Sequence, residues 1–568
     1  MKHHPIKFFR DHKILERPQQ KAVIDAVHEN WDKYTYFCLS LPTGVGKSYI
    51  ACAIADSLTN AYMLTSTLQL QTQYESSWDK IVNLKGRSNY KCNLNREFTV
   101  DAAPCTANSD LIRQCKISAT CDYYNQRDLA FRSQAFITNP VYLLYSAHCG
   151  FAKDEEESPW IEREVMIIDE AHNIEKHLIQ FAESDIDPKH LSDDLDVDVG
   201  HLQFTGDVEQ DYQTVIKIRD ELYLKAEELK EKIEKEFPRG LIEGANLKEW
   251  ARGITKKVAE KVQKLNARAY MLDKELQPLN IFFNTHDTPE ELLERWLISK
   301  VPDQNVLKLA PLYGNFLFTE YLGRLARKFV FLSATLGTKS AFCRELGIDP
   351  ELTLFMETES PFKPEKSPIV SLPAIKLSKD VYGENVKQLG GLIDSILDMH
   401  PKQRGIIHSV TYDIAREIFN GVSALNKKRL VCRDMDVLAA QKPGSYPRRY
   451  KNEELLQLHE SRGKDSGSVL LSPSMMEGVD LHDDLSEFQV IIKLPWSNLG
   501  DQRVKIKSKL DEEWYANKMW VAVMQAAGRS TRHEEDMAVT YILDKNFVYF
   551  YDLWKHQLPA WFKDRLVF

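Results

Sequence analysis

Three short stretches of the chain bring together residue types that handle phosphate groups. In "LSLPTGVGKSY", an apolar run precedes a glycine-containing turn and a run of small residues. Successive backbone N–H groups in such a turn, and at the start of the next helix, cradle phosphate oxygens. Taken alone, the stretch is equally compatible with a structural turn, because the full pattern has one more glycine. We predict a phosphate loop in which Lys47 reaches the β and γ phosphates and Ser48 ligates Mg²⁺, with a turn built from Thr43, Gly44 and Gly46.

The second stretch, "EVMIIDEAHNIE", places two carboxylates at the end of an apolar run. The run at 165–168 predicts a buried strand, and open α/β sheets place ligand chemistry at the carboxyl ends of their strands. We predict that Asp169 holds the Mg²⁺ shell and that Glu170 orients and deprotonates an attacking water. A strand followed by an acidic helix start is the alternative if this stretch is taken alone.

The third stretch, "WVAVMQAAGRSTRHEED", has helical spacing. Positions i, i+3, i+4 and i+7 put Gln525, Gly528, Arg529 and Arg532 on one helix face, so that both guanidinium groups reach one anion. Paired arginines suit a phosphoryl transition state, whose charge is spread over its equatorial oxygens. The alternative is a surface helix with two solvated arginines, but the two stretches upstream favour a catalytic role.

Length and charge set the frame for these stretches. A chain of 568 residues exceeds one hydrophobic core, and 43% hydrophobic with 28% charged residues indicates soluble globular domains. The net charge of -9 is concentrated between residues 183 and 211, which hold ten acidic residues and one lysine. Residues 80–135 have a local net of +4, a sign that suits phosphate binding but is also common on solvated surfaces.

Four of the nine cysteines fall within residues 92–121. No apolar segment has the length of a signal peptide core or a membrane span, so we expect a cytoplasmic chain. Thiols stay reduced there, and clustered cysteines indicate a metal or catalysis rather than disulfides. The remaining five are predicted core residues: Cys38, Cys52, Cys149, Cys343 and Cys432.

Together these stretches resemble the superfamily 2 helicases, specifically the iron–sulfur branch that includes the XPD and DinG proteins. "RPQQ" at 17–20 is similar to the adenine-recognising Q motif, with Gln20 as the base contact. Motif I of that superfamily commonly lacks the first glycine, which accounts for Leu41. "DEAH", "SATL", "EGVDL" and "QAAGRSTR" match motifs II, III, V and VI in that order along the chain.

The resemblance implies an α/β fold: two RecA-like parallel-sheet motor domains with an inserted iron–sulfur domain and a helical Arch-like insertion. "DYQTVIKIRDELYLKAEELKEKIEKEF" in the second insertion predicts a long exposed helix pair or hairpin. The expected parts are motor domain 1 at 1–85, 136–176 and 311–345, the cluster insertion at 86–135, the Arch-like insertion at 177–310, and motor domain 2 at 346–568.

The clustered cysteines lie between motifs I and II, where XPD and DinG proteins carry their cluster. Gaps of 12, 9 and 5 residues lack the close pair usual for structural zinc, whereas a [4Fe–4S] cluster needs only four thiolates that the fold brings together. We predict that the cluster ligands are Cys92, Cys105, Cys115 and Cys121. Zinc and unliganded core cysteines remain the alternatives.

By this resemblance the chain is a monomeric motor that uses ATP and Mg²⁺ to move 5′ to 3′ on single-stranded DNA and to open forked DNA. The strand passes through a hole formed by the cluster domain and the Arch. A nucleic-acid-dependent ATPase that remodels without unwinding, and an RNA helicase, are the alternatives. Candidate strand contacts are Thr65, Ser66, Thr67, Tyr123, Tyr124 and Ser409.

Overall fold

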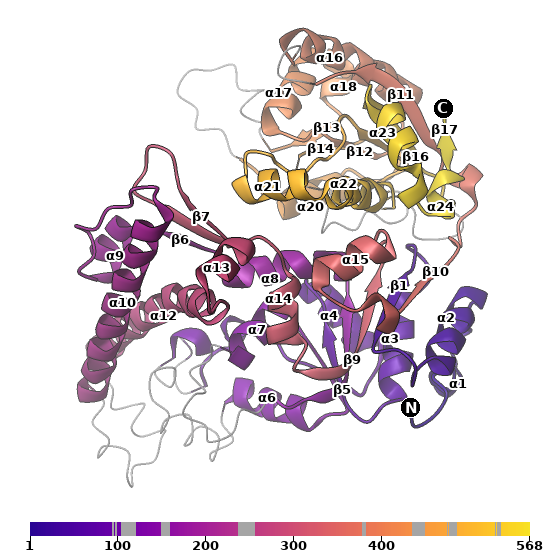
Figure 1. The fold of residues 1–568 in the computed structure, drawn as a ribbon. Coiled ribbons are helices and arrows are strands. Elements are labelled where there is room, and N and C mark those ends of the chain that lie inside the picture. Colours follow the sequence, from indigo (N-terminus) through magenta and orange to yellow (C-terminus); the bar gives the residue numbers. More distant parts are fainter. Residues whose placement is uncertain are drawn as a thin grey trace.

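Two seven-stranded sheets, each parallel throughout, organise the computed structural model of the chain (Figure 1). These sheets confirm the predicted pair of RecA-like domains. The structure describes residues 1–93, 96, 99–103, 121–148, 160–236, 256–377, 382–433, 435, 449–473, 475, 485–528, 530 and 536–568. Much of the predicted cluster insertion, including Cys105 and Cys115, lies outside these ranges.

The first domain has a sheet of order β10-β1-β9-β5-β2-β4-β3. Its strands are β1 (Tyr36–Ser40), β2 (Ala61–Leu64), β3 (Ile81–Asn83), β4 (Ala135–Thr138), β5 (Arg163–Asp169), β9 (Ala326–Ser333) and β10 (Thr353–Glu357). Its helices are α1 (Lys7–Asp11), α2 (Pro18–Glu29), α3 (Lys47–Asp56), α4 (Leu68–Ser77), α6 (Asp122–Arg132), α7 (Pro140–His148), α8 (Ile174–Ala182), α14 (Asn315–Leu317) and α15 (Lys339–Leu346).

Helices cover both faces of this sheet. Neighbouring residues of a strand point to opposite faces. On β5, Val165 and Ile167 therefore pack with α1 to α4, whereas Met166 and Ile168 pack with α6 to α8. Burial on both sides explains why the strands are apolar runs rather than alternating ones.

The predicted end of the first domain at residue 345 is wrong. Strand β10 pairs with β1 along its whole length, from Tyr36 opposite Thr353 to Ser40 opposite Glu357. The first sheet therefore continues to Glu357. The physical reason is a pairing between segments more than 300 residues apart, which leaves no local signal in the sequence.

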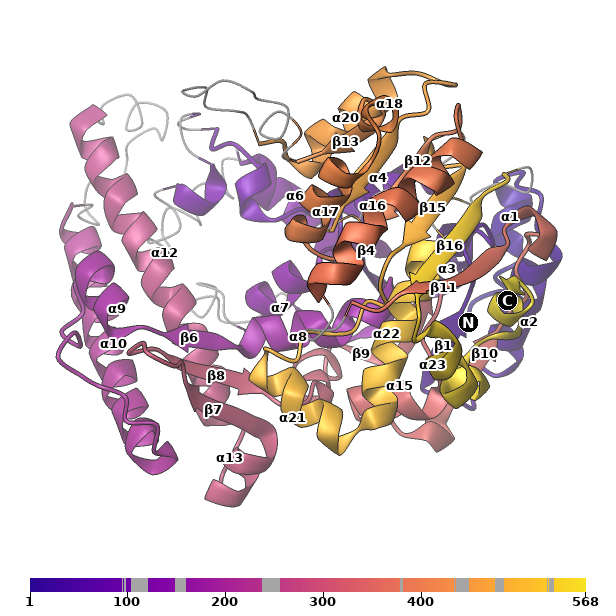
Figure 2. The same cartoon turned by 90° about the horizontal axis from the view of Figure 1, so that it is seen from above.

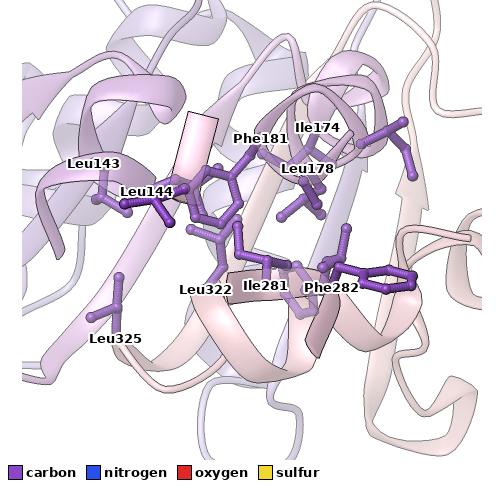
Figure 3. Packing of buried hydrophobic residues seen from close by; sticks show 14 of the residues in the cluster. Leu143, Leu144, Ile174, Leu178, Phe181, Ile281, Phe282, Leu322 and Leu325 are labelled. Atoms are coloured by element: carbon purple, nitrogen blue, oxygen red, sulfur yellow. The ribbon is translucent and has the colours of Figure 1, made fainter. Parts of the chain in front are cut away.

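The helical insertion begins at β6 (Ser184–Ile186) and ends at β8 (Leu307–Pro311); β7 (Trp296–Lys300) completes a small antiparallel sheet, which was not predicted. Its helices are α9 (Pro188–Leu195), α10 (Val208–Glu236), α12 (Lys256–Asn284) and α13 (Pro289–Arg295). Helices α10 and α12 lie side by side (Figure 2), which confirms the predicted helix pair. At its base, Ile281 and Phe282 of α12 face Leu178 and Phe181 of α8 in the core of the first domain (Figure 3).

The second domain has a sheet of order β13-β14-β12-β15-β16-β11-β17. Its strands are β11 (Ile369–Ile375), β12 (Gly405–His408), β13 (Leu430–Cys432), β14 (Val469–Ser472), β15 (Phe488–Ile491), β16 (Val539–Asp544) and β17 (Leu566–Val567). Its helices are α16 (Tyr382–Met399), α17 (Tyr412–Gly421), α18 (Ala424–Lys427), α20 (Asn452–Ser461), α21 (Gln502–Leu510), α22 (Glu512–Ala527), α23 (Phe547–Trp554) and α24 (Ala560–Lys563). Among the described helices, none is long and apolar enough to suit a bilayer-spanning segment.

Candidate nucleotide site and domain interface

The phosphate loop connects β1 to α3. Gly44 and Gly46 have φ of +82° and +87°, in the left-handed region that glycine adopts without strain. A Cβ on Gly46 would lie 2.4 Å from Nε2 of Gln20, so this position also has no room for a side chain. Helix α3 begins at Lys47, and its first-turn N–H groups have no partner within the helix. The loop thus offers the backbone cradle that a phosphate requires.

The segment at 17–20 lies against this loop, as the Q-motif resemblance implies. The Arg17 N–H donates to Oε1 of Gln20 at 2.8 Å, and the Arg17 guanidinium donates to the carbonyl of Gly44. Gln20 is buried beside Gly46. On the other side, a Cβ on Gly44 would lie 2.3 Å from the ring of Phe362, which follows β10. Sequence reasoning missed Phe362, because nothing local marks it as a neighbour of the loop.

The predicted carboxylates lie at the carboxyl end of β5. Asp169 is buried; its Oδ1 accepts from the Glu170 N–H and its Oδ2 from the Tyr74 hydroxyl, both at 2.9 Å. Burial and then the charge of Glu170 raise the pKa of Asp169 to about 6, while the charge of Lys47 acts in the opposite direction. The structure therefore brings Lys47, Asp169 and Glu170 into one electrostatic site.

Tyr74, on α4, was also missed. Burial and the charge of Asp169 raise the pKa of its phenol well above its ordinary value, and a hydrogen bond with Ser48 lowers it. Its position on the buried face of α4 is the only sequence signal, and that signal does not distinguish it from a core residue.

Glu170 has φ of +53°, a left-handed conformation that costs about 1–2 kcal/mol for a residue with a side chain. Its carboxylate lies 3.3 Å from Nδ1 of His172. The same ring nitrogen lies 2.8 Å from the hydroxyl of Ser333, at the end of the adjacent strand β9. The "DEAH" and "SATL" stretches are thus joined directly beside the phosphate loop.

The second domain reaches this site through α22. Gly528, at the end of α22, lies beside Thr43: a Cβ on Gly528 would be 3.4 Å from the threonine hydroxyl, an ordinary van der Waals distance. Gln525 lies one turn earlier on α22 and is half-buried. Arg529, Arg532 and the "EGVDL" stretch at 477–481 lie outside the described residues, so their predicted roles stay predictions.

A second contact between the domains is an interdomain ion cluster, which joins Glu175 and Glu345 of the first domain to Arg503, Lys507 and Lys518 of the second. Glu175 accepts from Arg503 Nη2 at 3.0 Å and from Lys507, and lies 3.4 Å from Lys518 Nζ. Lys518 donates to Glu345 at 2.5 Å.

The two carboxylates of this cluster titrate in opposite directions. Burial opposes ionisation of Glu175, but the three cations outweigh it and hold its pKa well below the ordinary range. For Glu345, burial and the charge of Glu175 raise the pKa to about 7. Glu175 lies three residues after "DEAH"; no sequence signal identified its partners.

The candidate strand contacts are mostly turned inward. Thr65 and Ser409 are buried, and the Ser409 hydroxyl donates to the Thr411 carbonyl at 3.2 Å. Ser66 is half-buried, and Thr67 accepts from the Leu70 N–H at the start of α4. Strand binding by these residues stays a prediction.

A cavity of about 660 Å³ lies between α4, α6, α7, residues 86–89 and α12. Its lining includes Tyr123, whose hydroxyl lies 2.6 Å from that of Tyr142; Tyr124 is buried next to it and does not line the cavity. Three cationic side chains and several aromatic rings share this wall: Arg87, Arg127, Lys274, Tyr145, Trp160 and Tyr270.

Two of the four clustered cysteines, Cys92 and Cys121, are buried in the same hydrophobic cluster. Burial raises the pKa of Cys121, whereas N–H groups of Tyr124 and Tyr123 at the start of α6 lower it and the nearby Cys92 raises it again. In the described ranges, no group of three or more His, Cys, Asp or Glu residues is arranged to hold a metal. Among the other cysteines Cys149 lies outside those ranges, while four are buried as predicted: Cys38, Cys52, Cys343 and Cys432.

A glycine-rich phosphate loop and an acidic strand end on one parallel sheet, contacted by a helix from a second parallel sheet, define a RecA-like nucleotide-binding architecture with two domains. The family described as helicase C-terminal domain matches residues 397–565, and the family described as type III restriction enzyme, res subunit, matches residues 13–191.

Among individual proteins, ATP-dependent DNA helicase CHL1 of Debaryomyces hansenii is 29% identical over 139 residues, 20% of this chain and 17% of that protein. ATP-dependent DNA helicase DDX11 of Mus musculus is 27% identical over 129 residues, 20% of this chain and 14% of that protein. These alignments span less than a fifth of each relative. An XPD helicase of known structure has the same fold, with a TM-score of 0.59 and 14% identity over 95% of this chain and 98% of its own.

The two family models each match less than a third of the chain, and together with the helicase relatives they support the resemblance to the superfamily 2 helicases that the motifs carry.

Proposed function

We propose that the protein is an ATP-dependent DNA helicase that moves 5′ to 3′ on single-stranded DNA. The observation that carries this proposal is the position of Gly528 beside Thr43, because it places the helix that precedes Arg529 and Arg532 next to the phosphate loop. Hydrolysis at such a contact changes how the two domains sit, which is how a two-domain motor converts ATP into movement. The relatives named ATP-dependent DNA helicase support DNA over RNA.

The chemistry follows from the residues around the loop. Bound MgATP supplies the phosphoryl group, and its metal neutralises charge that develops on the oxygens. Lys47 and the backbone of 44–48 hold the phosphates, while Ser48 and Asp169 hold the metal. Glu170 orients the attacking water and takes its proton. The hydrogen bond between His172 and Ser333 carries the state of this site to the adjacent strand β9.

The cavity beside the predicted cluster insertion supports a path for the DNA strand. It combines cationic side chains for the phosphates with aromatic rings for the bases, the pairing that single-strand binding uses. Helix α12 closes one side, and its buried Asn266 donates to the Ala103 carbonyl of the cluster segment at 3.3 Å. The strand thus passes between the first domain, the cluster segment and the helical insertion.

A [4Fe–4S] cluster held by Cys92, Cys105, Cys115 and Cys121 completes this path. The burial of Cys92 with Cys121, and the backbone N–H groups aimed at Cys121, suit thiolates bound to a cluster. We expect brown protein with about four irons per chain. Cys105→Ser should lose iron and unwinding but retain much of its ATP hydrolysis, because the nucleotide site is built from distant residues. Zinc in place of iron, or normal unwinding by metal-free Cys105→Ser, would contradict the proposed cluster.

The test of the function is strand separation by anaerobically purified protein on forked, 5′-tailed and 3′-tailed DNA and on RNA duplexes. We expect opening of forked and 5′-tailed DNA and none of 3′-tailed DNA. Opening of RNA duplexes alone would favour an RNA helicase. Hydrolysis that nucleic acid stimulates, without strand separation on any duplex, would favour an ATPase that remodels its target.

A further inference from the structure

Tyr74 lies on the buried face of α4, and its hydroxyl reaches the candidate nucleotide site. Its side chain is 1% exposed, and its ring belongs to the hydrophobic cluster between the first sheet and α1 to α4. The hydroxyl donates to Oδ2 of Asp169 at 2.9 Å. A phenylalanine would fill the same place in the cluster, so the packing does not require the hydroxyl.

We propose that Tyr74 is a positioning residue of the metal site, which holds the Asp169 carboxylate in the orientation that binds Mg²⁺. This inference rests on the proposed ATP-dependent function, and it assigns to that site a residue that none of the sequence motifs contains.

The geometry around Asp169 carries the argument. One carboxylate oxygen accepts from the Glu170 N–H and the other from Tyr74, so the group is fixed at both ends. A carboxylate oxygen accepts two hydrogen bonds or metal contacts, and each oxygen of Asp169 therefore keeps one position for the metal or its water. The backbone donor cannot be removed by mutation, whereas the phenol can.

Outer partners of this kind orient metal ligands, and their loss typically lowers metal affinity by roughly 10- to 100-fold. Tyr74 also lies within reach of Ser48, the second predicted Mg²⁺ ligand. The Tyr74 hydroxyl thus lies near both the loop predicted to bind phosphate and the strand end predicted to bind metal. Without it, the Asp169 carboxylate is free to rotate away from the metal position.

The test is binding of a fluorescent, non-hydrolysable ATP analogue by full-length Tyr74→Phe, titrated with Mg²⁺. We expect the Mg²⁺ concentration at half-maximal binding to rise about tenfold, while the weak binding in EDTA stays the same. Binding of Mn²⁺ followed by electron paramagnetic resonance should weaken by the same factor. The matched control is Tyr62→Phe, which removes a buried hydroxyl that donates to the Ile161 carbonyl at 2.7 Å, and should leave the midpoint unchanged.

A double variant separates positioning from a general loss of structure. If Tyr74 acts through Asp169, then Tyr74→Phe should change the Mg²⁺ midpoint little when Asp169→Asn is already present. A midpoint for Tyr74→Phe equal to wild type, or an equal shift in the Asp169→Asn background, would overturn the inference. If wild-type protein shows no Mg²⁺-dependent nucleotide binding, the proposed function itself fails, which is a different and distinguishable result.

Discussion

Asp169 and Glu175 are both buried and lie only six residues apart, yet their surroundings are opposite. Asp169 faces the phosphate loop, where burial and Glu170 raise its pKa to about 6. Glu175 faces the second domain, where Arg503, Lys507 and Lys518 hold its pKa well below the ordinary range. Asp169 thus has charges of opposite sign on either side, from Glu170 and Lys47, whereas Glu175 is surrounded by three cations.

This difference indicates that the two ends of the segment 169–175 have different roles. In the proposed function, Asp169 gains a cationic partner when MgATP binds and loses it on release. The interdomain ion cluster is paired in this structure and joins the two domains on the other side of the segment. Asp169 of the nucleotide site and Glu175 of the interdomain ion cluster are therefore separated by only six residues of chain.

The largest expected effect comes from substitutions in the candidate nucleotide site. Lys47→Ala should abolish ATP hydrolysis stimulated by nucleic acid, because the phosphates lose their point-charge partner. Glu170→Gln should still bind nucleotide but turn over about 10²- to 10⁴-fold more slowly, because an amide cannot take the proton of the water. Steady-state hydrolysis and nucleotide binding would be measured together. The control is Glu162→Gln on the exposed surface; turnover near wild type in either site variant would refute the site.

The arginines that α22 leads to should rank next. Arg529→Ala and Arg532→Ala are expected to bind ATP normally and to hydrolyse it roughly 10³-fold more slowly, since loss of an arginine finger has costs of this size. Single-turnover kinetics at saturating ATP measures this step. If affinity falls while turnover is unchanged, these residues position the bound nucleotide rather than the transition state.

Glu175→Gln tests the other half of the comparison. Removing one charge from a buried ion pair leaves its partners unpaired, at a cost of about 3–5 kcal/mol. We expect calorimetry to show a lower unfolding temperature or two separated domain transitions. The control is Lys308→Gln, which breaks the partly exposed interdomain pair with Asp501 at 3.3 Å and should cost no more than about 1 kcal/mol. Equal shifts in the two variants would mean that the buried cluster does not hold the domains.

The smallest expected effect is a pH dependence within the interdomain ion cluster. Because the folded pKa of Glu345 is raised to about 7, the folded state binds its proton more tightly than the unfolded chain does. Its stabilisation is complete below the unfolded pKa, near 4.5, and is lost as the pH rises to 7, with a slope of at most about 1.4 kcal/mol per pH unit. The lowered pKa of Glu175 acts only at lower pH.

Glu345→Gln imitates the protonated form. Urea unfolding midpoints between pH 5 and 7.5 should therefore change less with pH in this variant than in wild type. Identical slopes for the two proteins would exclude Glu345 as the titrating group.

The parts of the site that sequence predicted are those that depend on local backbone. Composition and spacing over a few residues are enough to predict three features: the turn at Gly44 and Gly46, the strand before Asp169, and the long helix pair. Tyr74, Phe362 and the partners of Glu175 were missed because each contact joins segments that lie far apart in the chain. The wrong boundary at residue 345 has the same cause, since only pairing with β1 places β10 in the first sheet.

The position of β9 has a consequence for how the chain is made. In the finished sheet, β9 lies between β1 and β5, yet it follows β5 in the chain by more than 150 residues. While a ribosome synthesises the helical insertion, β9 does not yet exist. The backbone N–H and C=O groups of β1 and β5 that later pair with β9 therefore have no strand partner. Exposed edges of this kind attract other chains. We expect that early folding of the helical insertion, which brings β9 closer to β1 and β5, favours correct closure of the sheet.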